Sequence, residues 1–278
     1  MISERSKRRA TNFISITCAT WLLFSLIPFH LTVCADEKIL IAAATNLNPA
    51  MDDICKEFEK AYPTIDVNVS YGSSGNFFAQ IKQGAPFDIF FSADTTYPAR
   101  LEEEGLAVKG GSKIYAFGSI VLWIPKNSAL NPRKGLHIVL DSKVKKLAIA
   151  NQRLAPYGMA AEEALRHYGL WDKVQEKLVF GENISQTAQF VQSGAADVGI
   201  IALSQAISPK MKSDGDYLVI PAESYNKLGQ AYVVLQRGKD KSCVRKFLEF
   251  TQGKKGEIIF SQYGYSLPKQ IKNIDNKN

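Results

Sequence analysis

Apolar and polar residues follow two alternating patterns along most of the chain. Short apolar runs predict buried strands, and after each run a stretch with apolar residues three or four positions apart predicts a helix. The first example is an apolar run at 38–43, followed by Asn48-Pro49 and a helix with Ala50, Ile54 and Phe58 on one face. Further strands are predicted at 65–69, 88–91, 146–150 and 179–180, with helices at 77–83, 159–168 and 186–192.

Two segments resemble each other beyond this general pattern. Residues 74–94 and 184–203 each run from a polar turn through a helix to a glycine, an acidic residue and a strand. The chain therefore looks internally duplicated. Repeated strand–helix units favour an α/β fold in which each of two lobes is a mainly parallel sheet flanked by helices.

Two apolar runs, 118–125 and 229–235, are placed to carry the chain out of the first lobe and back. These two crossing strands would form the hinge. We therefore expect lobe 1 to comprise residues 36–117 with a return segment at 230–278, and lobe 2 to comprise residues 118–229.

The first 35 residues have the pattern of a signal peptide. Four basic residues between Arg5 and Arg9 precede an almost uncharged run at 13–31, and Val33-Cys34-Ala35 has small residues where signal peptidase needs them, so we expect cleavage before Asp36. A membrane anchor is the competing reading, but Pro28 and His30 interrupt the apolar run, which is short for a spanning helix. A lipoprotein anchored through Cys34 is a weaker alternative. The expected location is periplasmic.

Charge gives no indication of a nucleic-acid partner. The whole chain has a net charge of +7, but the leader holds four of the 34 bases and one of the 27 acids, so the mature chain carries only +4. The short basic runs at 143–146 and 254–255 read as solvated surface. Of four cysteines, only Cys55 and Cys243 remain after cleavage, and the sequence leaves open whether they pair or stay as buried thiols.

The turns that open the predicted helices contain hydroxyl, amide and small residues, without Arg, Lys or His. They are Thr45-Asn46, Ser73-Ser74, Tyr157-Gly158 and Ile184-Ser185. In open α/β sheets ligands bind beyond the carboxyl ends of the strands, where helix starts expose unpaired N–H groups. Ordinary helix capping explains any single turn. Four turns, two in each lobe, favour an anion site built from neutral donors, which disfavours a protonated oxyanion such as hydrogen phosphate.

The order and spacing of several motifs closely resemble the periplasmic molybdate-binding proteins of ABC importers. The motifs are residues 41–46 (IAAATN), 72–75 (GSSG), 84–88 (GAPFD), 92–94 (SAD), 155–158 (APYG), 182–186 (ENISQ) and 194–199 (GAADVG). The resemblance runs over nearly all of residues 38–268. It implies a type II periplasmic-binding-protein fold and a molybdate or tungstate ion held between two lobes without a charged side chain.

Carried over by position, the family pattern implies five ligand-binding residues: Thr45 through its hydroxyl, Asn46 through its backbone N–H, Ser74 through both groups, and Tyr157 and Ile184 through their N–H groups. Some family members place a tyrosine hydroxyl after the strand that reads 198–201 here. This chain has Ala202 there, and we expect Thr45 or Asn46 to replace that donor.

Other chemistry has little support in the sequence. His137 and His167 belong to no metal or triad spacing. Asp94 and Asp197 are better read as loop hydrogen-bond acceptors than as an acid–base pair, and Glu182 as a surface residue beside a helix start. The tyrosines at 115, 217, 225, 232, 263 and 265 are read as lobe packing rather than as iron ligands.

We therefore expect a monomeric receptor that delivers molybdate or tungstate to an ABC permease, with no enzymatic activity, no cofactor and no direct cation ligands. The alternative is a receptor for another tetrahedral oxyanion such as sulfate.

Overall fold

The computed structural model describes residues 37–130 and 132–268, without the side chains of 132 and 133. The predicted signal peptide, its cleavage site and Cys34 lie outside the described residues. Within the described part of the chain, no helix has the length and apolar character needed to cross a membrane.

Two five-stranded sheets form the centres of two lobes. The first sheet has the order β2-β1-β3-β10-β4 and the second has the order β7-β6-β8-β5-β9. The first contains β1 (Glu37–Ala44), β2 (Ile65–Gly72), β3 (Ile89–Ser92), β4 (Lys113–Gly118) and β10 (Leu228–Val234). The second contains β5 (Ile120–Pro125), β6 (Leu147–Ala150), β7 (Leu178–Gly181), β8 (Val198–Ala202) and β9 (Gly215–Val219).

The two sheets repeat one arrangement. In each, three neighbouring strands are parallel, and the next two strands add antiparallel pairings. The predicted parallel core is therefore present in both lobes, and each whole sheet is mixed. Because β1, β2 and β3 occupy the same positions as β6, β7 and β8, the internal duplication read from the sequence is also a duplication of topology.

Helices cover both sheets. Those beside the first sheet are α1 (Asn48–Ala61), α2 (Ser74–Lys82), α3 (Thr96–Glu103), α9 (Ser242–Gln252) and α10 (Lys254–Gln262). Those of the second lobe are α4 (Pro156–His167), α5 (Trp171–Val174), α6 (Ile184–Gln192), α7 (Leu203–Ala206) and α8 (Pro209–Asp214). Short 3₁₀ segments are η1 (Thr45–Leu47), η2 (Pro132–Leu140), η3 (Gln175–Lys177), η4 (Ala222–Ser224) and η5 (Gln236–Gly238).

Most predicted elements are present, with helix starts shifted. The helix predicted to begin after Asn48 as N-cap already includes Asn48, because the turn η1 precedes it and Leu47 takes the cap position. Ala50, Ile54 and Phe58 are buried as expected. The nine-residue helices α2 and α6 begin earlier than the apolar pattern suggested, since the first turn of α2 is mostly polar or small and that of α6 has a single apolar residue, Ile184. Each ends before a glycine of positive φ, at Gly84 and Gly194.

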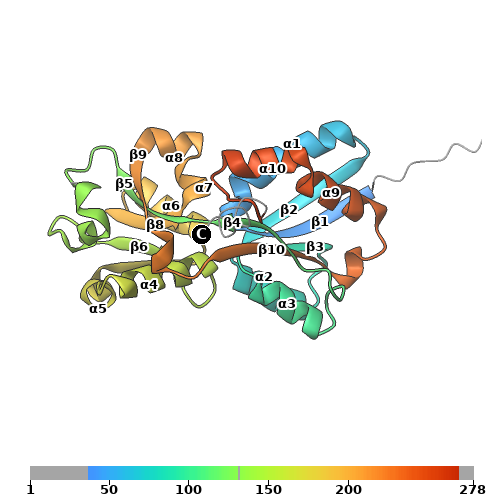
Figure 1. The fold of residues 1–278 in the computed structure, drawn as a ribbon, viewed down its shortest axis with the longest axis horizontal. Coiled ribbons are helices and arrows are strands. Elements are labelled where there is room, and N and C mark those ends of the chain that lie inside the picture. Colours follow the sequence, from blue (N-terminus) through green and yellow to red (C-terminus); the bar gives the residue numbers. More distant parts are fainter. Residues whose placement is uncertain (1–36, 131, 269–278) are drawn as a thin grey trace, which may run out of the picture. The chain divides into compact units, whose positions relative to one another are not determined.

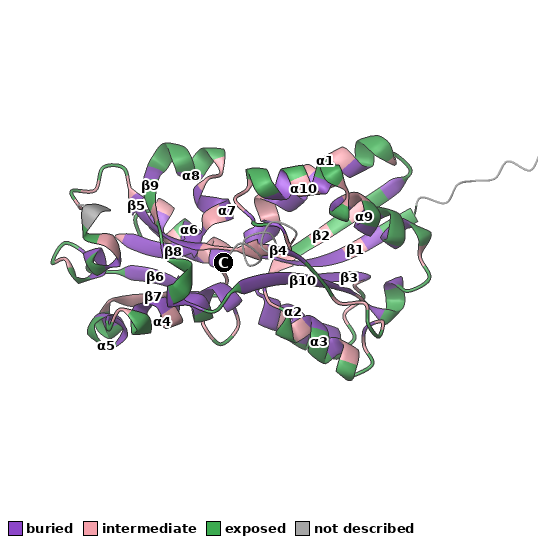
Figure 2. Cartoon of the chain, viewed as in Figure 1, coloured by how far each residue is buried: buried purple, intermediate pink, exposed green. Residues whose placement is uncertain are grey.

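Both faces of each sheet are buried under helices, as parallel strands require. In β1, Ile41 and Ala43 pack on one side with Phe58 and Phe247, while Ala42 packs on the other side with Phe77. Figure 2 shows the strands of both sheets mainly buried and the outer helix faces mainly exposed. Burial on both faces explains why strands such as β1 and β5 carry apolar residues at successive positions.

The chain passes between the lobes through strands. Only Ser119 separates β4 in the first sheet from β5 in the second, and β10 returns to the first sheet after β9 (Figure 1). The predicted apolar run 118–125 corresponds to β5, and only its first residue, Gly118, belongs to β4 in the other sheet. In the first sheet β10 pairs with β3, and in the second sheet β5 pairs with β8. The strands that cross between the lobes therefore border the parallel part of each sheet.

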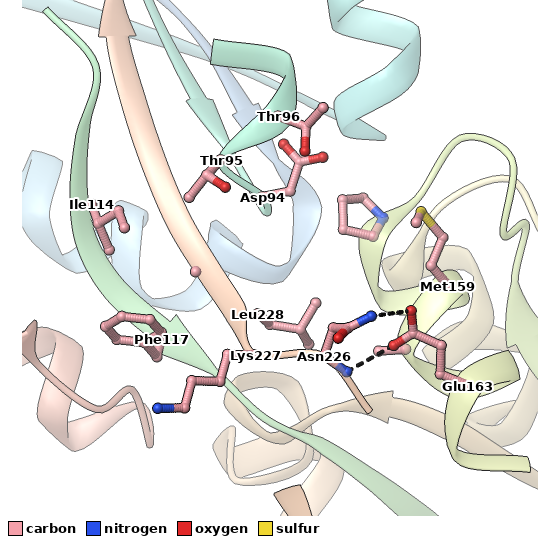
Figure 3. A pocket seen from close by; sticks show the side chains of 13 residues that line it. Asp94, Thr95, Thr96, Ile114, Phe117, Met159, Glu163, Asn226, Lys227 and Leu228 are labelled. Atoms are coloured by element: carbon pink, nitrogen blue, oxygen red, sulfur yellow. Dashed lines mark hydrogen bonds between the residues drawn. The ribbon is translucent and has the colours of Figure 1, made fainter. Parts of the chain in front are cut away.

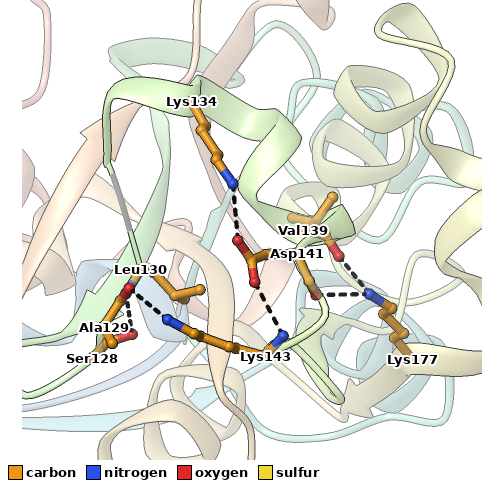
Figure 4. Close-up of polar contacts among 8 residues, drawn as sticks. All are labelled: Ser128, Ala129, Leu130, Lys134, Val139, Asp141, Lys143 and Lys177. Atoms are coloured by element: carbon orange, nitrogen blue, oxygen red, sulfur yellow. Dashed lines mark hydrogen bonds and ion pairs between the residues drawn. The ribbon is translucent and has the colours of Figure 1, made fainter.

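The ion pairs of the described residues lie mainly at the surface, and those of the buried Asp88 differ. In the second lobe Asp141 accepts hydrogen bonds from Lys134 Nζ at 3.0 Å and from the backbone N–H of Lys143 at 3.1 Å (Figure 4). Lys143 is exposed, as predicted for that basic run. In the first lobe the buried carboxylate of Asp88 pairs with Arg237 and Lys241 at 2.6 and 2.8 Å.

Candidate functional site

The five residues predicted to bind an oxyanion line one small cavity of about 10 Å³. Thr45, Asn46 and Ser74 come from the first lobe, and Tyr157 and Ile184 from the second. The remaining lining residues are small or uncharged: Ala44, Gly72, Ser73, Ala93, Ala155 and Pro156. The structure thus brings together four chain segments that are distant in sequence.

Each of these segments is the beginning of a helical turn that follows a strand of a parallel core. Thr45 and Asn46 open η1 directly after β1, and Ser74 is the first residue of α2 after β2. Tyr157 is the second residue of α4 after β6, and Ile184 is the first residue of α6 after β7. The carboxyl ends of parallel strands meet at one sheet edge, and the two edges face the cavity.

Local capping leaves donors free at the cavity. The Asn183 side chain accepts hydrogen bonds from the N–H groups of Ser185 and Gln186, both at 3.0 Å. The Ser73 hydroxyl accepts one from Asn76 N at 3.4 Å. These caps leave out the first N–H of each helix, and the N–H groups of Ser74 and Ile184 have no hydrogen-bond partner among the described residues. Two helix starts therefore present unpaired donors to the cavity.

The Ser74 hydroxyl is oriented by the backbone. It accepts a hydrogen bond from Ala93 N at 3.0 Å, and both residues line the cavity. A hydroxyl that accepts one bond keeps its own proton for another acceptor. Ser74 can thus offer two donors, its O–H and its N–H, to one ligand.

Thr45 and Asn46 occupy different roles. The Thr45 hydroxyl lies 3.4 Å from both Asn183 Oδ1 and Ser185 N, which are long contacts across the two lobes. The Asn46 side chain turns inward instead, donating from Nδ2 to Gln230 and Tyr265, both at 2.8 Å. Asn46 therefore faces the cavity with its backbone.

A buried polar network behind Asn46 is the part of the site that sequence reasoning missed. Tyr265 OH donates to the Asn46 carbonyl at 2.9 Å, and Ser204 Oγ of the second lobe donates to the same carbonyl at 2.8 Å. Gln230 also donates to the Ala93 carbonyl at 3.3 Å. Burial raises the pKa of Tyr265 to about 12, so its hydroxyl stays protonated. No spacing in the sequence links Tyr265 to residue 46, and it was read only as a packing residue.

Tyr157 is held rigidly by its surroundings. Its side chain is 2% exposed, and burial raises its pKa well above the ordinary value. Its hydroxyl packs against Gly118 at the end of β4, where a Cβ would come within 2.1 Å of that oxygen. The backbone N–H of Tyr157 is therefore anchored through the ring to a strand that crosses between the lobes.

Among the residues that the structure describes, no charged side chain lines the cavity. Glu182 precedes the α6 cap but does not reach the cavity; its carboxylate accepts a hydrogen bond from Asn76 Nδ2 at 2.9 Å. Electropositive potential at the cavity comes from unpaired N–H groups and the dipoles of α2, α4 and α6. Such a donor-only site suits a fully deprotonated oxyanion.

The other candidates lie elsewhere. Asp94 accepts from Tyr97 N at 3.2 Å and Asp197 from Lys146 N at 2.8 Å, so both act as the predicted loop acceptors. The rings of His137 and His167 both pack against Tyr168. Cys55 and Cys243 are free thiols in the core around β1. Within the described residues, no three His, Cys, Asp or Glu side chains gather as a metal site.

A wider crevice of about 390 Å³ adjoins the small cavity but has a different character. It includes Asp94, Ile114, Met159, Glu163 and Lys227, and Asn226 bridges to Glu163 through two hydrogen bonds of 2.8 Å (Figure 3). None of the five predicted residues lines it. Its carboxylates and exposed apolar side chains do not suit an oxyanion.

Comparison with known proteins agrees with this geometry. Residues 39–266 match the family described as bacterial extracellular solute-binding protein. The chain belongs to this family. Among curated members it is 36% identical over 239 residues to the molybdate-binding protein ModA of Azotobacter vinelandii, covering 85% of this chain and 94% of that protein. It is 35% identical over 235 residues to ModA of Rhodobacter capsulatus, covering 84% and 90%.

The family likeness extends to three dimensions. A solved structure titled as the Azotobacter vinelandii periplasmic molybdate-binding protein superposes with a TM-score of 0.78 at 34% identity, covering 83% of this chain and 99% of that chain. The two-lobed α/β fold expected from the sequence is therefore confirmed. The relatives in this family are solute-binding proteins by name, which is consistent with a binding protein rather than an enzyme.

Proposed function

We propose that this protein is a receptor that binds molybdate or tungstate between its two lobes and delivers it to an ABC importer. The observation that carries the proposal is the cavity where Thr45, Asn46, Ser74, Tyr157 and Ile184 meet, lined by neutral donors from both lobes. Relatives of 35–36% identity are named as molybdate-binding proteins. In this proposal the oxyanion is the transported ligand, and no cofactor or cation is required.

Neutral donors are sufficient for a dianion in this setting. A hydrogen bond to a charged acceptor contributes about 1.5–3 kcal/mol net, and each helix terminus adds about 0.3–1 kcal/mol. We assign the bonds to the Thr45 hydroxyl, the Asn46 N–H, both Ser74 donors, and the N–H groups of Tyr157 and Ile184. Ala202 is the buried N-cap of α7 and brings no hydroxyl, so Thr45 or Asn46 supplies the remaining donor.

Closure of the lobes would signal the loaded state. Ligand donors come from both lobes, so a bound oxyanion favours the closed arrangement and shifts the population toward it. The permease would then recognise the closed form of a monomeric, periplasmic receptor released by cleavage before Asp36. We assign residues 36–117 and 230–278 to lobe 1 and residues 118–229 to lobe 2, supported by the passage of the chain between sheets at Ser119 and before β10.

Sulfate is the second candidate, since it is also a tetrahedral dianion and carries no O–H group that a donor-only site would leave unpaired. It differs from molybdate mainly in size. The test is thermal unfolding of the purified protein with molybdate, tungstate, sulfate, phosphate or ferric citrate in parallel. A ligand at about 100 times its Kd adds about 2.7 kcal/mol to stability. Stabilisation by molybdate and tungstate alone is the expected result. Stabilisation by phosphate or ferric citrate alone would contradict the proposal, and stabilisation by sulfate alone would select the second candidate.

A further inference from the structure

The two lobes touch through contacts that lie beside the cavity as well as through those that line it. Gly75 N donates to the Leu154 carbonyl at 2.9 Å, and Asn76 Nδ2 donates to Glu182 Oε1 at 2.9 Å. The Ser185 hydroxyl donates to the Thr45 carbonyl at 3.3 Å, and the Ser204 hydroxyl donates to the Asn46 carbonyl at 2.8 Å. The structure is therefore that of the closed arrangement.

The side-chain contact between Asn76 and Glu182 joins the two lobes outside the cavity lining. Thr45 and Asn46 line the cavity, whereas Asn76 and Glu182 do not. The pair can therefore be changed without removing a residue assigned to the ligand.

The pair joins the opening turns of α2 and α6, the two matching helices of the internal repeat, at different positions in the two turns. Asn76 is the third residue of α2, and Glu182 directly precedes Asn183, the N-cap of α6. Both backbones are fixed locally, since Asn76 N donates to Ser73 Oγ at 3.4 Å and Glu182 N donates to Gln186 Oε1 at 2.7 Å. The side chains meet because the capping turns of the two helices face each other across the cavity.

We propose that Asn76 and Glu182 form a latch that holds the lobes closed and sets how long the ligand stays bound, without selecting which ligand binds. They are positioning residues, and the inference rests on the proposed function. The bond exists only when the lobes are together, so its free energy belongs to the closed state alone and changes the balance between open and closed populations.

The position of the latch limits its strength. Glu182 is exposed and Asn76 is partly exposed, so water competes for both groups and the bond is weaker than a buried one. A weak latch is what a transport receptor needs, because a strong one would close the empty protein as well. The latch slows the opening of every closed molecule, and because the bond is weak, molecules without ligand still spend most of their time open.

The test is a double-mutant cycle on dissociation of molybdate by stopped flow, with Asn76→Ala, Glu182→Ala and the combined variant. We expect each single variant to raise koff by about 3- to 10-fold, with kon little changed. The combined variant should be no faster than the faster single variant, since both remove one bond. Glu182→Gln keeps an acceptor oxygen and should restore part of the slow dissociation.

The matched control is Asn68→Ala, which removes an Asn–carboxylate bond of 2.7 Å to Asp66 within one lobe. It should leave koff unchanged. In all latch variants the ratio of Kd values for molybdate and sulfate should stay at the wild-type value. Unchanged koff in both single variants, or additive effects in the combined variant, would overturn the latch while leaving the oxyanion receptor intact.

A second readout reports on the contact directly. The Gly75 amide, bonded to Leu154 across the lobes, should be protected from hydrogen exchange in the wild type and less protected in Asn76→Ala and Glu182→Ala. If the wild type binds none of the oxyanions, the proposed function fails and the latch fails with it, whereas unchanged Gly75 protection in both variants at saturating molybdate would overturn the latch alone. A Gly75 amide that exchanges freely in the wild type under all conditions would contradict it.

Discussion

The hydroxyl of Ser74 accepts a hydrogen bond of 3.0 Å from the backbone N–H of Ala93. This bond aligns the hydroxyl proton for a ligand in the cavity. Replacing Ser74 with Ala removes one donor to the oxyanion, so we expect Kd for molybdate to rise about 10- to 100-fold, measured by titration calorimetry.

The neighbouring hydroxyl provides the control for this prediction. Ser73 caps α2 by accepting from Asn76 N, so Ser73→Ala should lower the free energy of unfolding by about 1 kcal/mol and change Kd much less. Equal Kd values for wild type and Ser74→Ala would mean that the second turn only caps its helix.

The network behind Asn46 should matter for both stability and affinity. Tyr265→Phe removes the bond donated to the Asn46 carbonyl and the acceptor for Asn46 Nδ2. Both groups are buried, so we expect the free energy of unfolding to fall by about 1–3 kcal/mol in chemical denaturation. Kd should rise several-fold because the Asn46 N–H loses its alignment.

Tyr263→Phe is the matched change. The Tyr263 hydroxyl donates to Asp53 at 2.8 Å, away from the cavity, and its loss should leave Kd unchanged. If Tyr265→Phe also left Kd unchanged, the network would be structural only.

The pH dependence of stability should carry a signature of Asp94. Burial raises the pKa of its carboxyl above the ordinary value of 3.8, against opposing hydrogen bonds from Ser92 and Tyr97. The folded state then binds the proton more tightly than the unfolded state. Its contribution to stability is complete below the unfolded pKa and is lost as pH rises through the folded pKa.

An asparagine at this position cannot ionise but keeps an oxygen acceptor for the backbone. Asp94→Asn should therefore have a higher Tm than the wild type at pH 7, with the difference shrinking toward pH 4. Asp197→Asn, directly before β8 in the second lobe, replaces the carboxylate that accepts bonds from Lys145 N and Lys146 N with a neutral, weaker acceptor and should lower Tm at pH 7. A lower Tm for Asp94→Asn at every pH would contradict the role of burial.

The two cysteines should react slowly with thiol reagents. Burial, followed by the carboxylates of Glu59 and Asp52, raises the pKa of Cys55 to about 12. Burial also raises the pKa of Cys243. At pH 8 only about one Cys55 in ten thousand is a thiolate, which is the reactive form. Labelling with Ellman's reagent should be slow in buffer and fast in denaturant, and mass spectrometry should find no Cys55–Cys243 disulfide.

Much of this molecule follows from local sequence. Apolar runs such as that in β1 predict strands, and Asn48-Pro49, Gly84 and Gly194 mark helix ends, because these signals act within a few residues. The five cavity residues were also available in advance, from the polar turns and from the order of motifs that resembles a known family. What the local signals misjudged was the start of α2 and α6, whose first turns carry no apolar periodicity.

The sequence by itself determined the strand–helix order, the repeat of that order and the uncharged character of the turns that face a ligand, because each depends on residues close together in the chain. Only the tertiary structure decided which groups that are distant in sequence form hydrogen bonds with each other. The bonds of Asn46 with Tyr265 and Ser204, and of Asn76 with Glu182, join residues 219, 158 and 106 positions apart. Such contacts depend on how two sheets face each other, and no periodicity along the chain records that distance.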